Sequence, residues 1–355
     1  MTGRIIITTS KYPPEVGGTG VHFSLLKQAL EKLNIPVTVL VRPGLLDLIA
    51  KTRREDIVLG HTTPRVLFPI FIGSFFCGYR VVIRVGGDFF WERAVEEGRF
   101  FGTLRGFYAR GTFTFRERCV LWLTGIALRR ADAVVFTSPL LHDIYIPFFC
   151  LDQRKTHTIT HAVSKLPAAP SRRPQVGGFS SVVRMLYAGR FIKLKNLNML
   201  LEVFAETKKK FANIKLVLIG DGHEEEVLKL KMRDLGLEQA VEFKKPMEHV
   251  NILQELAASD LAVLPSLSEV SPNLLTDALS VATPILATRE NGLVRIIGEA
   301  GVWFDPALKE DFSRKLEEIL QPGMLQELGR RIADHPYRKT WDEVAEEYQK
   351  VISNI

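Results

Sequence analysis

The 355-residue sequence has little that could crosslink it covalently or hold it in a bilayer. Its three cysteines, Cys77, Cys119 and Cys150, are too few and too scattered for a disulfide framework or a zinc site. We expect them to be small buried apolar side chains in a reducing compartment. No signal peptide pattern is visible, and no apolar run reaches the ~18 residues of a membrane span. These absences predict a cytoplasmic protein that is at most peripheral to the inner face of a membrane.

Several catalytic signatures are missing as well. The sequence has no P-loop, no CxxC pair and no Ser-His-Asp order, and its histidines lack metal-ligand spacing. The segment 13–20 reads PPEVGGTG rather than GxGxxG, and no acidic residue ends the following strand, which disfavours a dinucleotide site. No nucleic-acid-binding motif accompanies the pI of 9.2. We therefore expect no metal, no cofactor and no nucleic-acid partner.

The composition is that of a globular protein, with 46% hydrophobic and 25% charged residues. The net charge of +7 favours anionic partners. Positive charge gathers in residues 99–130, where seven arginines and large aromatic side chains accompany a single acidic residue, Glu117. This segment predicts either a helical surface that rests on anionic lipid headgroups or a solvated arginine face above a buried aromatic stripe.

Strand-like and helix-like segments alternate through both halves of the chain. Residues 5–9, 21–33 and 37–41 form a strand-helix-strand pattern, and the pattern restarts at 183–188. This alternation predicts an α/β protein of two Rossmann-like domains, each a doubly wound parallel sheet, facing each other across a cleft. We place the domains at 1–164 and 181–335. A Pro/Ala/Gly/Ser-rich linker over 165–180 joins them, and a terminal helix occupies 336–355.

Two basic residues follow the first strand of the second half. Gly189-Arg190 comes directly after the predicted strand 183–188, and Lys195 lies near the start of the next helix. Ligands of open α/β sheets bind at the carboxyl ends of the strands, where an arginine fork and a lysine charge would hold a diphosphate. The alternative is a pair of surface cations.

A polar loop follows the strand that ends at residue 265. Ser271 has the character of a helix N-cap and Pro272 that of a first helical residue, so the helix start would offer free N–H groups to an anion. Glu269 and Asp277 flank this helix start. Carboxylates repel phosphate, so we expect them to bind sugar hydroxyls, unless they are surface acids beside a capped helix.

The first half offers two weaker sites. Gly17, Gly18 and Gly20 would let the backbone approach a ligand after the first strand, unless they form a structural turn. Asp88 follows Gly86-Gly87 at the exit of a predicted strand, where it would line the receiving wall of a sugar site or act as a helix N-cap.

Together these residues resemble family 4 of the retaining glycosyltransferases, which have the GT-B fold. The resemblance covers nearly the whole chain and is best marked over 186–305. The family's G-R-x(4)-K element corresponds to Gly189, Arg190 and Lys195, and its E-x7-E pair to Glu269 and Asp277. The family's His-Asp pair falls at Gly87-Asp88, so the histidine is replaced.

The resemblance implies a role for each matched residue. Arg190 and Lys195 would bind the donor diphosphate, Glu269 the donor sugar and Asp277 the nucleotide ribose. The family's catalytic set and donor site also imply contacts from Asp88, Gly18, Gly189, Ser271, Pro272, Asn273 and Leu274. The terminal helix would cross back onto the first domain.

The family's reaction moves a sugar from a nucleoside diphosphate, such as UDP or GDP, to an acceptor hydroxyl in polysaccharide or glycolipid synthesis. In its retaining front-face mechanism the leaving phosphate oxygen takes the acceptor proton, and fixed cations stabilise the leaving group without a metal. Two alternatives stay open: a GT-B nucleotide-sugar epimerase, and an inactive scaffold of a glycan assembly machinery.

Overall fold

The computed structural model describes residues 3–13, 18–163 and 182–355, and these residues form two compact units. Unit 1 contains residues up to 91, residues 108–162 and residues 339–355. Unit 2 contains residues 92–107 and 163–338. The predicted linker, 165–180, lies outside the described residues.

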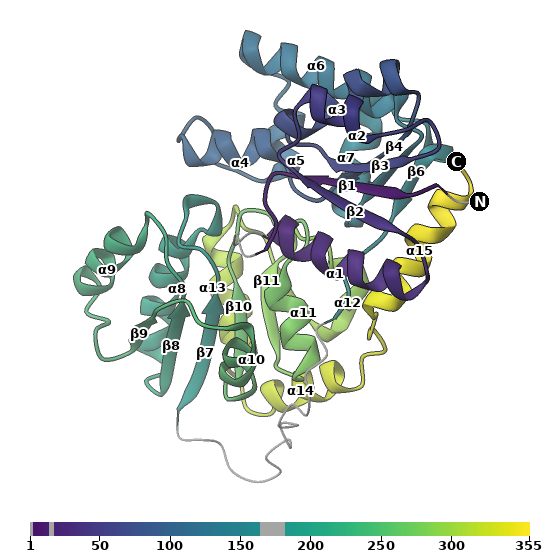
Figure 1. Cartoon of the computed structure of the whole chain (residues 1–355). Helices are drawn as coiled ribbons and strands as arrows, with labels where there is room; N and C mark the ends of the chain where they lie inside the picture. The colour runs from purple at the N-terminus through teal and green to yellow at the C-terminus, as the bar shows by residue number, and fades with distance from the viewer. Residues whose placement is uncertain (1–2, 14–17, 164–181) are drawn as a thin grey trace. The chain divides into compact units, whose positions relative to one another are not determined.

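Unit 1 is built on a six-stranded parallel sheet in the order β2-β1-β3-β4-β5-β6 (Figure 1). Its register pairs Ile5 with Val37 and with Ile57. The strands are short and rich in β-branched residues, as buried parallel strands are. They comprise β1 (Ile5–Thr9), β2 (Val37–Val41), β3 (Ile57–His61), β4 (Arg80–Val85), β5 (Ala133–Phe136) and β6 (Thr156–Thr158).

Helices cover both faces of this sheet. Alternate strand residues such as Ile5, Ile7 and Val82 pack in one core with α1 and α15, whereas Val81 and Ile83 lie on the side of α3 and α6. Local signals fix the helix ends. A Thr114–Glu117 capping box starts α6, and Gly78, with φ 68°, ends α3. The helices are α1 (Gly18–Lys32), α2 (Leu45–Lys51), α3 (Pro64–Cys77), α6 (Phe115–Arg130), α7 (Pro139–Phe149), the 3-10 turn η1 (Gln153–Lys155) and α15 (Trp341–Ser353).

Helix α15 completes the core of unit 1. Its buried residues Val344, Ala345 and Tyr348 pack with Phe23 and Leu26 of α1. The helix therefore belongs to unit 1, although all of the second half of the chain separates it from the strands it supports.

Unit 2 repeats the architecture with the strand order β12-β11-β10-β7-β8-β9, again all parallel (Figure 1). The strands are β7 (Val183–Ala188), β8 (Ile214–Ile219), β9 (Val241–Lys244), β10 (Leu261–Leu264), β11 (Ile285–Thr288) and β12 (Val302–Phe304). The helices are η2 (Lys193–Lys195), α8 (Leu197–Lys210), α9 (Glu225–Asp234), α10 (His249–Ala257), α11 (Asn273–Ser280), α12 (Val294–Ile297), η3 (Gly298–Ala300), α13 (Lys309–Ile319) and α14 (Met324–Ala333).

Residues 92–107 are a segment of the first half that packs in unit 2. They hold the end of α4 (Phe89–Glu96) and the start of α5 (Leu104–Ala109), so each of these helices passes from one unit to the other. The sequence prediction assigned this segment to the first domain. No local pattern marks it, because its assignment depends on contacts with residues far along the chain.

The cysteine prediction was wrong in part. Cys119 and Cys150 are exposed and Cys77 is half-buried. All three are free thiols, so none acts as the buried apolar side chain that we expected.

Candidate functional site

The strand order of unit 2 identifies where a ligand would bind. The chain runs outward from β7 to β8 and β9 on one side, and from β10 to β11 and β12 on the other. The connections therefore reverse direction between β7 and β10, and ligands of open α/β sheets bind at the carboxyl ends of the strands flanking such a point. The loops that leave β7 and β10 carry Arg190, Lys195 and Glu269, which are three of the predicted site residues.

The loop after β7 is held by the turn Gly220-Asp221-Gly222 at the end of β8. The Phe191 amide donates to the Asp221 carbonyl at 2.6 Å, and the Glu224 amide donates to the Phe191 carbonyl at 3.0 Å. Gly220 has φ 150°, and a Cβ there would overlap the carbonyl oxygen of Gly189. Glycine at this position is therefore what allows the turn to support the Gly189-Arg190 segment closely.

Lys195 and Glu269 form an ion pair across the two loops. Their side chains are only 14% and 12% exposed, so the pair is shielded from water and ions. The Ser266 hydroxyl donates to the same Glu269 oxygen, Oε1, at 2.7 Å. The Leu267 amide also donates to the Leu194 carbonyl at 3.0 Å, which fixes one loop against the other. The structure thus brings together two predicted site residues that lie 74 positions apart.

Arg190 is exposed, and in the part of the chain that the structure describes its guanidinium makes no hydrogen bond or ion pair. Its carbonyl accepts a hydrogen bond of 2.9 Å from the hydroxyl of Tyr187, which anchors the backbone. Burial, together with the nearby Glu269 charge, raises the pKa of Tyr187 well above its ordinary value, so this phenol stays protonated as the donor. Arg190 is therefore a cation on a fixed backbone with its side chain available to an anion.

Asp277 lies on α11 and contacts a different partner. Its Oδ1 is 3.0 Å from Nε2 of His249, the first residue of α10. The hydrogen bond to Asp277 raises the pKa of His249, against the effect of burial. Asp277 is 4% exposed, whereas the His249 ring is half exposed. His249 is not among the residues that the sequence predicts for the site. Its pairing with Asp277, 28 positions away, has no local signal.

The start of α11 differs by one residue from the prediction. The helix begins at Asn273 with Pro272 as its N-cap, and no side-chain cap bond is formed. Pro272 provides the extended cap backbone and Ser271 precedes the cap, so Ser271 is not the N-cap. The first amides, those of Asn273 and Leu274, have no acceptor within the helix and remain a site for an anion.

The segment 92–107 supports both loops. The Leu194 amide donates to Oε1 of Glu96 at 3.1 Å, and Lys193 Nζ donates to the Glu96 carbonyl at 3.1 Å. On the other loop, Oγ of Ser268 accepts a bond of 2.9 Å from the Leu104 amide. Glu96, Leu104 and Ser268 are thus positioning residues that the sequence prediction missed.

Asp88, a predicted site residue, is held by hydrogen bonds within unit 1. Asp88 is 1% exposed and accepts hydrogen bonds from the Trp91 amide at 2.7 Å and from the hydroxyls of Tyr108 and Tyr145 at 2.5 and 2.7 Å. Burial raises its pKa, while these donors oppose that rise. This geometry favours the helix N-cap interpretation of Asp88 over a sugar contact.

Gly18 is the first residue of α1, and residues 14–17 of the glycine-rich loop lie outside the described residues. A Cβ on Gly20 would lie 2.8 Å from the Lys11 carbonyl oxygen. Gly20 therefore serves the packing of the turn itself. The described part of the loop supports the structural interpretation of Gly20 and leaves a ligand contact from Gly18 as a prediction.

A family of known proteins matches the part of the chain that contains the unit 2 site. Residues 173–335 match the family model described as glycosyl transferases group 1. This match covers slightly less than half of the chain. All the site residues described above in unit 2, apart from the supporting segment 92–107, lie within the matched region.

Curated relatives match parts of the chain. The chain is 27% identical to D-inositol 3-phosphate glycosyltransferase of Acidothermus cellulolyticus over 173 residues, which are 46% of this chain and 39% of that protein. It is 26% identical to mannosylfructose-phosphate synthase of Agrobacterium fabrum over 253 residues, 66% of this chain and 55% of that protein. The chain thus spans between 39% and 55% of the length of these relatives.

Solved structures match the whole chain in fold. Sucrose-phosphate synthase from Thermosynechococcus elongatus has a TM-score of 0.78 at 16% identity over 99% of this chain and 98% of its own. The structure of Anabaena Alr3699/HepE in complex with UDP also has a similar fold. The HepE complex scores 0.74 at 15% identity over 99% of this chain and 100% of its own. The fold outside the matched region is therefore also that of the GT-B glycosyltransferases.

Proposed function

We propose that this protein is a retaining glycosyltransferase that moves a sugar from a nucleoside diphosphate to an acceptor hydroxyl. The observation that carries the proposal is the Lys195–Glu269 ion pair, which joins the two loops that flank the β7/β10 reversal point. Arg190 lies on the first of these loops. A diphosphate needs cations, and a sugar needs hydrogen-bond acceptors, and this site offers both within one pair of loops.

Each residue then has a defined task. Arg190 and Lys195 bind the diphosphate, with help from the first amides of α11. Glu269 accepts hydrogen bonds from the donor sugar, and its ion pair keeps Lys195 extended toward the phosphates. Asp277, oriented by His249, binds the ribose.

The chemistry requires stabilisation of the leaving diphosphate. As the glycosidic C–O bond breaks, charge grows on the phosphate oxygen, and each fixed donor aimed at it lowers the barrier by about 3 kcal/mol. The same oxygen takes the proton of the acceptor hydroxyl as the new C–O bond forms on the same face of the sugar. No separate base and no metal are then required.

The proposed donor base is uracil, with guanine as the second choice. A UDP complex is among the solved structures of similar fold, which supports testing UDP first. The acceptor is proposed to be a glycan or a glycolipid, with the protein in peripheral contact with an anionic membrane.

A thermal-shift panel with UDP, GDP, ADP, CMP and NAD tests the site. A ligand at 100 times its Kd adds about 2.7 kcal/mol of stability, which is easily measured. We expect a shift with one nucleoside diphosphate that Arg190→Ala removes and that Arg233→Ala, an exposed arginine of α9, keeps. A shift with NAD alone would contradict the proposal.

Turnover separates the remaining alternatives. With a donor identified, a glycosyltransferase needs an acceptor and gives a product of unchanged anomeric configuration by NMR. An epimerase, the second candidate, would convert the nucleotide sugar without any acceptor. An inactive scaffold would bind no donor, and an inverted product would overturn the retaining mechanism.

A further inference from the structure

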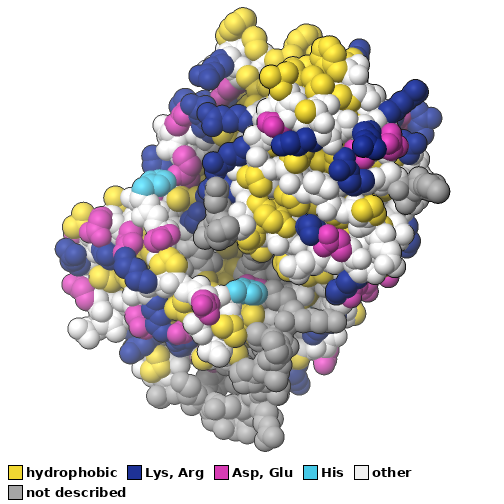
Figure 2. Space-filling view, viewed as in Figure 1, with side chains coloured by type: hydrophobic (Ala, Val, Ile, Leu, Met, Phe, Trp, Pro, Cys, Tyr) yellow, Lys and Arg dark blue, Asp and Glu magenta, His cyan; other side chains and the backbone are white. Residues whose placement is uncertain are grey.

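Unit 1 exposes a group of large apolar side chains on three neighbouring helices. Figure 2 shows hydrophobic side chains gathered over the end of unit 1 that carries α3 and α6, with lysine and arginine side chains beside them. Helix α2 packs on α3, and α3 packs on α6, so their outer residues share one surface. We call it the α3–α6 face, and its exposed apolar residues are Leu46, Ile49, Ile72, Phe75, Phe76, Phe115, Trp122 and Leu123.

Helix α3 is apolar on both sides. Its inner side buries Val66, Leu67 and Ile70, whereas Phe75 and Phe76 are 60% and 71% exposed. On α6, Phe115 and Trp122 are 84% and 64% exposed. An exposed apolar area of this kind marks an interaction surface rather than a fold requirement.

The charge on α3 and α6 is almost wholly positive, and on α2 the exposed Asp47 is paired with Lys51 at 3.3 Å. Helices α3 and α6 carry five arginines, Arg65, Arg116, Arg118, Arg129 and Arg130. Their one acidic residue, Glu117, is occupied in the capping box of α6 and lies 3.7 Å from Arg110. Arginines around exposed aromatic side chains are complementary to anionic headgroups above an apolar phase.

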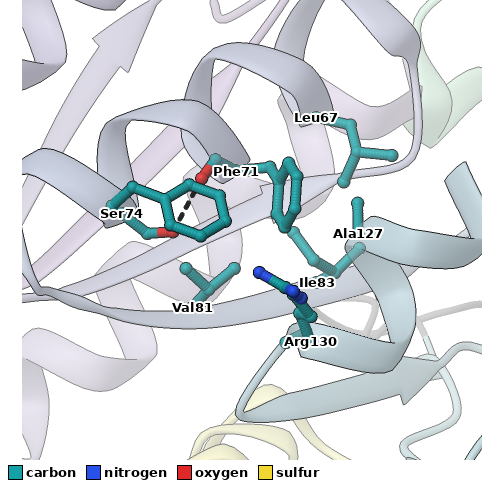
Figure 3. A pocket seen from close by; sticks show the side chains of 9 residues that line it. Leu67, Phe71, Ser74, Val81, Ile83, Ala127 and Arg130 are labelled. Carbon is teal, nitrogen blue, oxygen red and sulfur yellow. Dashed lines mark hydrogen bonds between the residues drawn. The ribbon is translucent and has the colours of Figure 1, made fainter. Parts of the chain in front are cut away.

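A cavity of about 140 Å³ opens on the same face (Figure 3). Its walls come from α3, β4 and α6, including Leu67, Phe71, Val81 and Ile83. The Ser74 hydroxyl donates to its own helix at the Phe71 carbonyl, at 2.7 Å, so it presents no unsatisfied group to the space. An open cavity of this size with mainly apolar walls has room for a group comparable to a benzene ring.

Arg130 lines this cavity, and its guanidinium lies 5.4 Å from the ring centre of Phe75. In the described part of the chain no carboxylate pairs with it. A guanidinium beside an apolar cavity matches a molecule that joins an anionic group to a hydrocarbon chain.

We propose that the α3–α6 face docks on an anionic membrane and that the cavity takes a segment of one lipid acyl chain, with Arg130 on a headgroup phosphate. This proposal specifies the membrane contact of the proposed function, but it does not depend on sugar transfer. The sequence analysis predicted the membrane contact over residues 99–130. Residues 99–107 belong to unit 2, and the proposed surface includes α2 and α3 in their place.

Flotation tests the docking without any sugar substrate. We expect the protein to float with vesicles of phosphatidylcholine mixed with about one third phosphatidylglycerol, and not with phosphatidylcholine alone. Arg116→Glu/Arg118→Glu should weaken binding by more than about tenfold, since each basic residue near such a surface contributes roughly fivefold. Failure of the wild type to float with the anionic vesicles would overturn the proposal.

A matched pair of exposed phenylalanines locates the surface. Phe115→Ser should reduce binding, whereas Phe101→Ser, in unit 2 and 73% exposed against 84% for Phe115, should not. Brominated acyl chains should quench Trp122 fluorescence, and Trp122→Phe should remove most of that quenching. Equal losses in the two phenylalanine variants would contradict the assignment to the α3–α6 face.

The fluorescent fatty acid cis-parinarate tests the cavity. We expect saturable binding that Ser74→Leu, which fills the cavity, and Arg130→Glu both weaken, while Phe101→Ser leaves it unchanged. Thermal unfolding of each variant checks that unit 1 is intact. Unchanged parinarate binding in a folded Ser74→Leu protein would overturn the acyl-chain site. Because neither assay contains a nucleotide sugar, these failures are distinct from a failure of the glycosyltransferase proposal.

Discussion

Lys195 and Glu269 form an ion pair that joins the loops after β7 and β10. Sequence analysis predicts both residues as donor ligands, but only the structure shows that each is the other's partner. Neutralising one member of the pair therefore changes the electrostatic environment of the other. Removing the lysine would leave a poorly solvated carboxylate, and removing the carboxylate would release the lysine.

We expect Glu269→Gln to lower kcat by about 100-fold or more while UDP binding is kept. The amide preserves the shape of the side chain and leaves Lys195 free to bind the diphosphate. Steady-state kinetics and a UDP thermal shift on the same variant check this. Loss of UDP binding together with activity would show that Glu269 acts only by placing Lys195.

A second residue-scale prediction concerns buried histidines beside an arginine in unit 1. Arg84 Nη2 lies 3.1 Å from Nε2 of His161, and His61 is also buried near it. Burial, and then the Arg84 charge, lowers the pKa of His61 to about 4 and that of His161 to about 3. The unfolded chain takes up these protons near 6.5, whereas the folded protein does so only at lower pH.

The free energy of unfolding should therefore fall as pH decreases from about 6.5 to about 4, with His61 accounting for up to about 3 kcal/mol. Urea denaturation across this range measures the slope. His61→Gln should flatten the slope, and His142→Gln, a half-exposed histidine of α7, should not. An unchanged slope in His61→Gln would mean that other groups dominate.

At the scale of elements, the turn after β8 depends on glycine. Gly220→Ala should destabilise unit 2 by about 1–3 kcal/mol, because the new Cβ meets the Gly189 carbonyl and the backbone is at φ 150°. In Gly329→Ala, on α14, the nearest atom to the new Cβ is 3.9 Å away, so we expect a gain of about 0.5–1 kcal/mol. Chemical denaturation compares the two. An unchanged free energy of unfolding in Gly220→Ala would show that the turn accommodates the added Cβ without loss of stability.

Sequence patterns predicted some elements and missed others. Strands β1 and β7 have contiguous apolar or β-branched residues, and their predicted ranges match the structure. The prediction did not include β3 or the 14-residue helix α3. β6 and β12 have three residues each and exist through their hydrogen bonds to a neighbouring strand. Sequence analysis also missed the Asp277–His249 pair and the role of Glu96, because local spacing carries no information about partners far along the chain.

At the scale of the whole molecule, the units are not consecutive stretches of sequence. The chain passes between them near residues 91, 107, 162 and 338. Each unit therefore depends on a segment that sequence order assigns elsewhere: unit 1 on α15, and unit 2 on residues 92–107. Among the described residues no helix is long and apolar enough to cross a membrane.

Deleting residues 339–355 should destabilise unit 1 selectively, because Val344, Tyr348 and Ile352 form part of its core. We expect hydrogen exchange to lose protection in β1–β3 while β7 and β8 stay protected. Protected β1–β3 strands in the truncated protein would mean that α15 is dispensable for the sheet of unit 1.

The late position of α15 also matters while the protein is being made. The strands of unit 1 leave the ribosome early, yet the helix that covers one face of their sheet is translated only after the whole of unit 2. At about 5–20 residues per second, the nascent sheet waits on the order of ten seconds or longer with α1 lacking its partner. Chaperones that shield apolar surfaces would act during that interval, and unit 2 would complete its fold before unit 1.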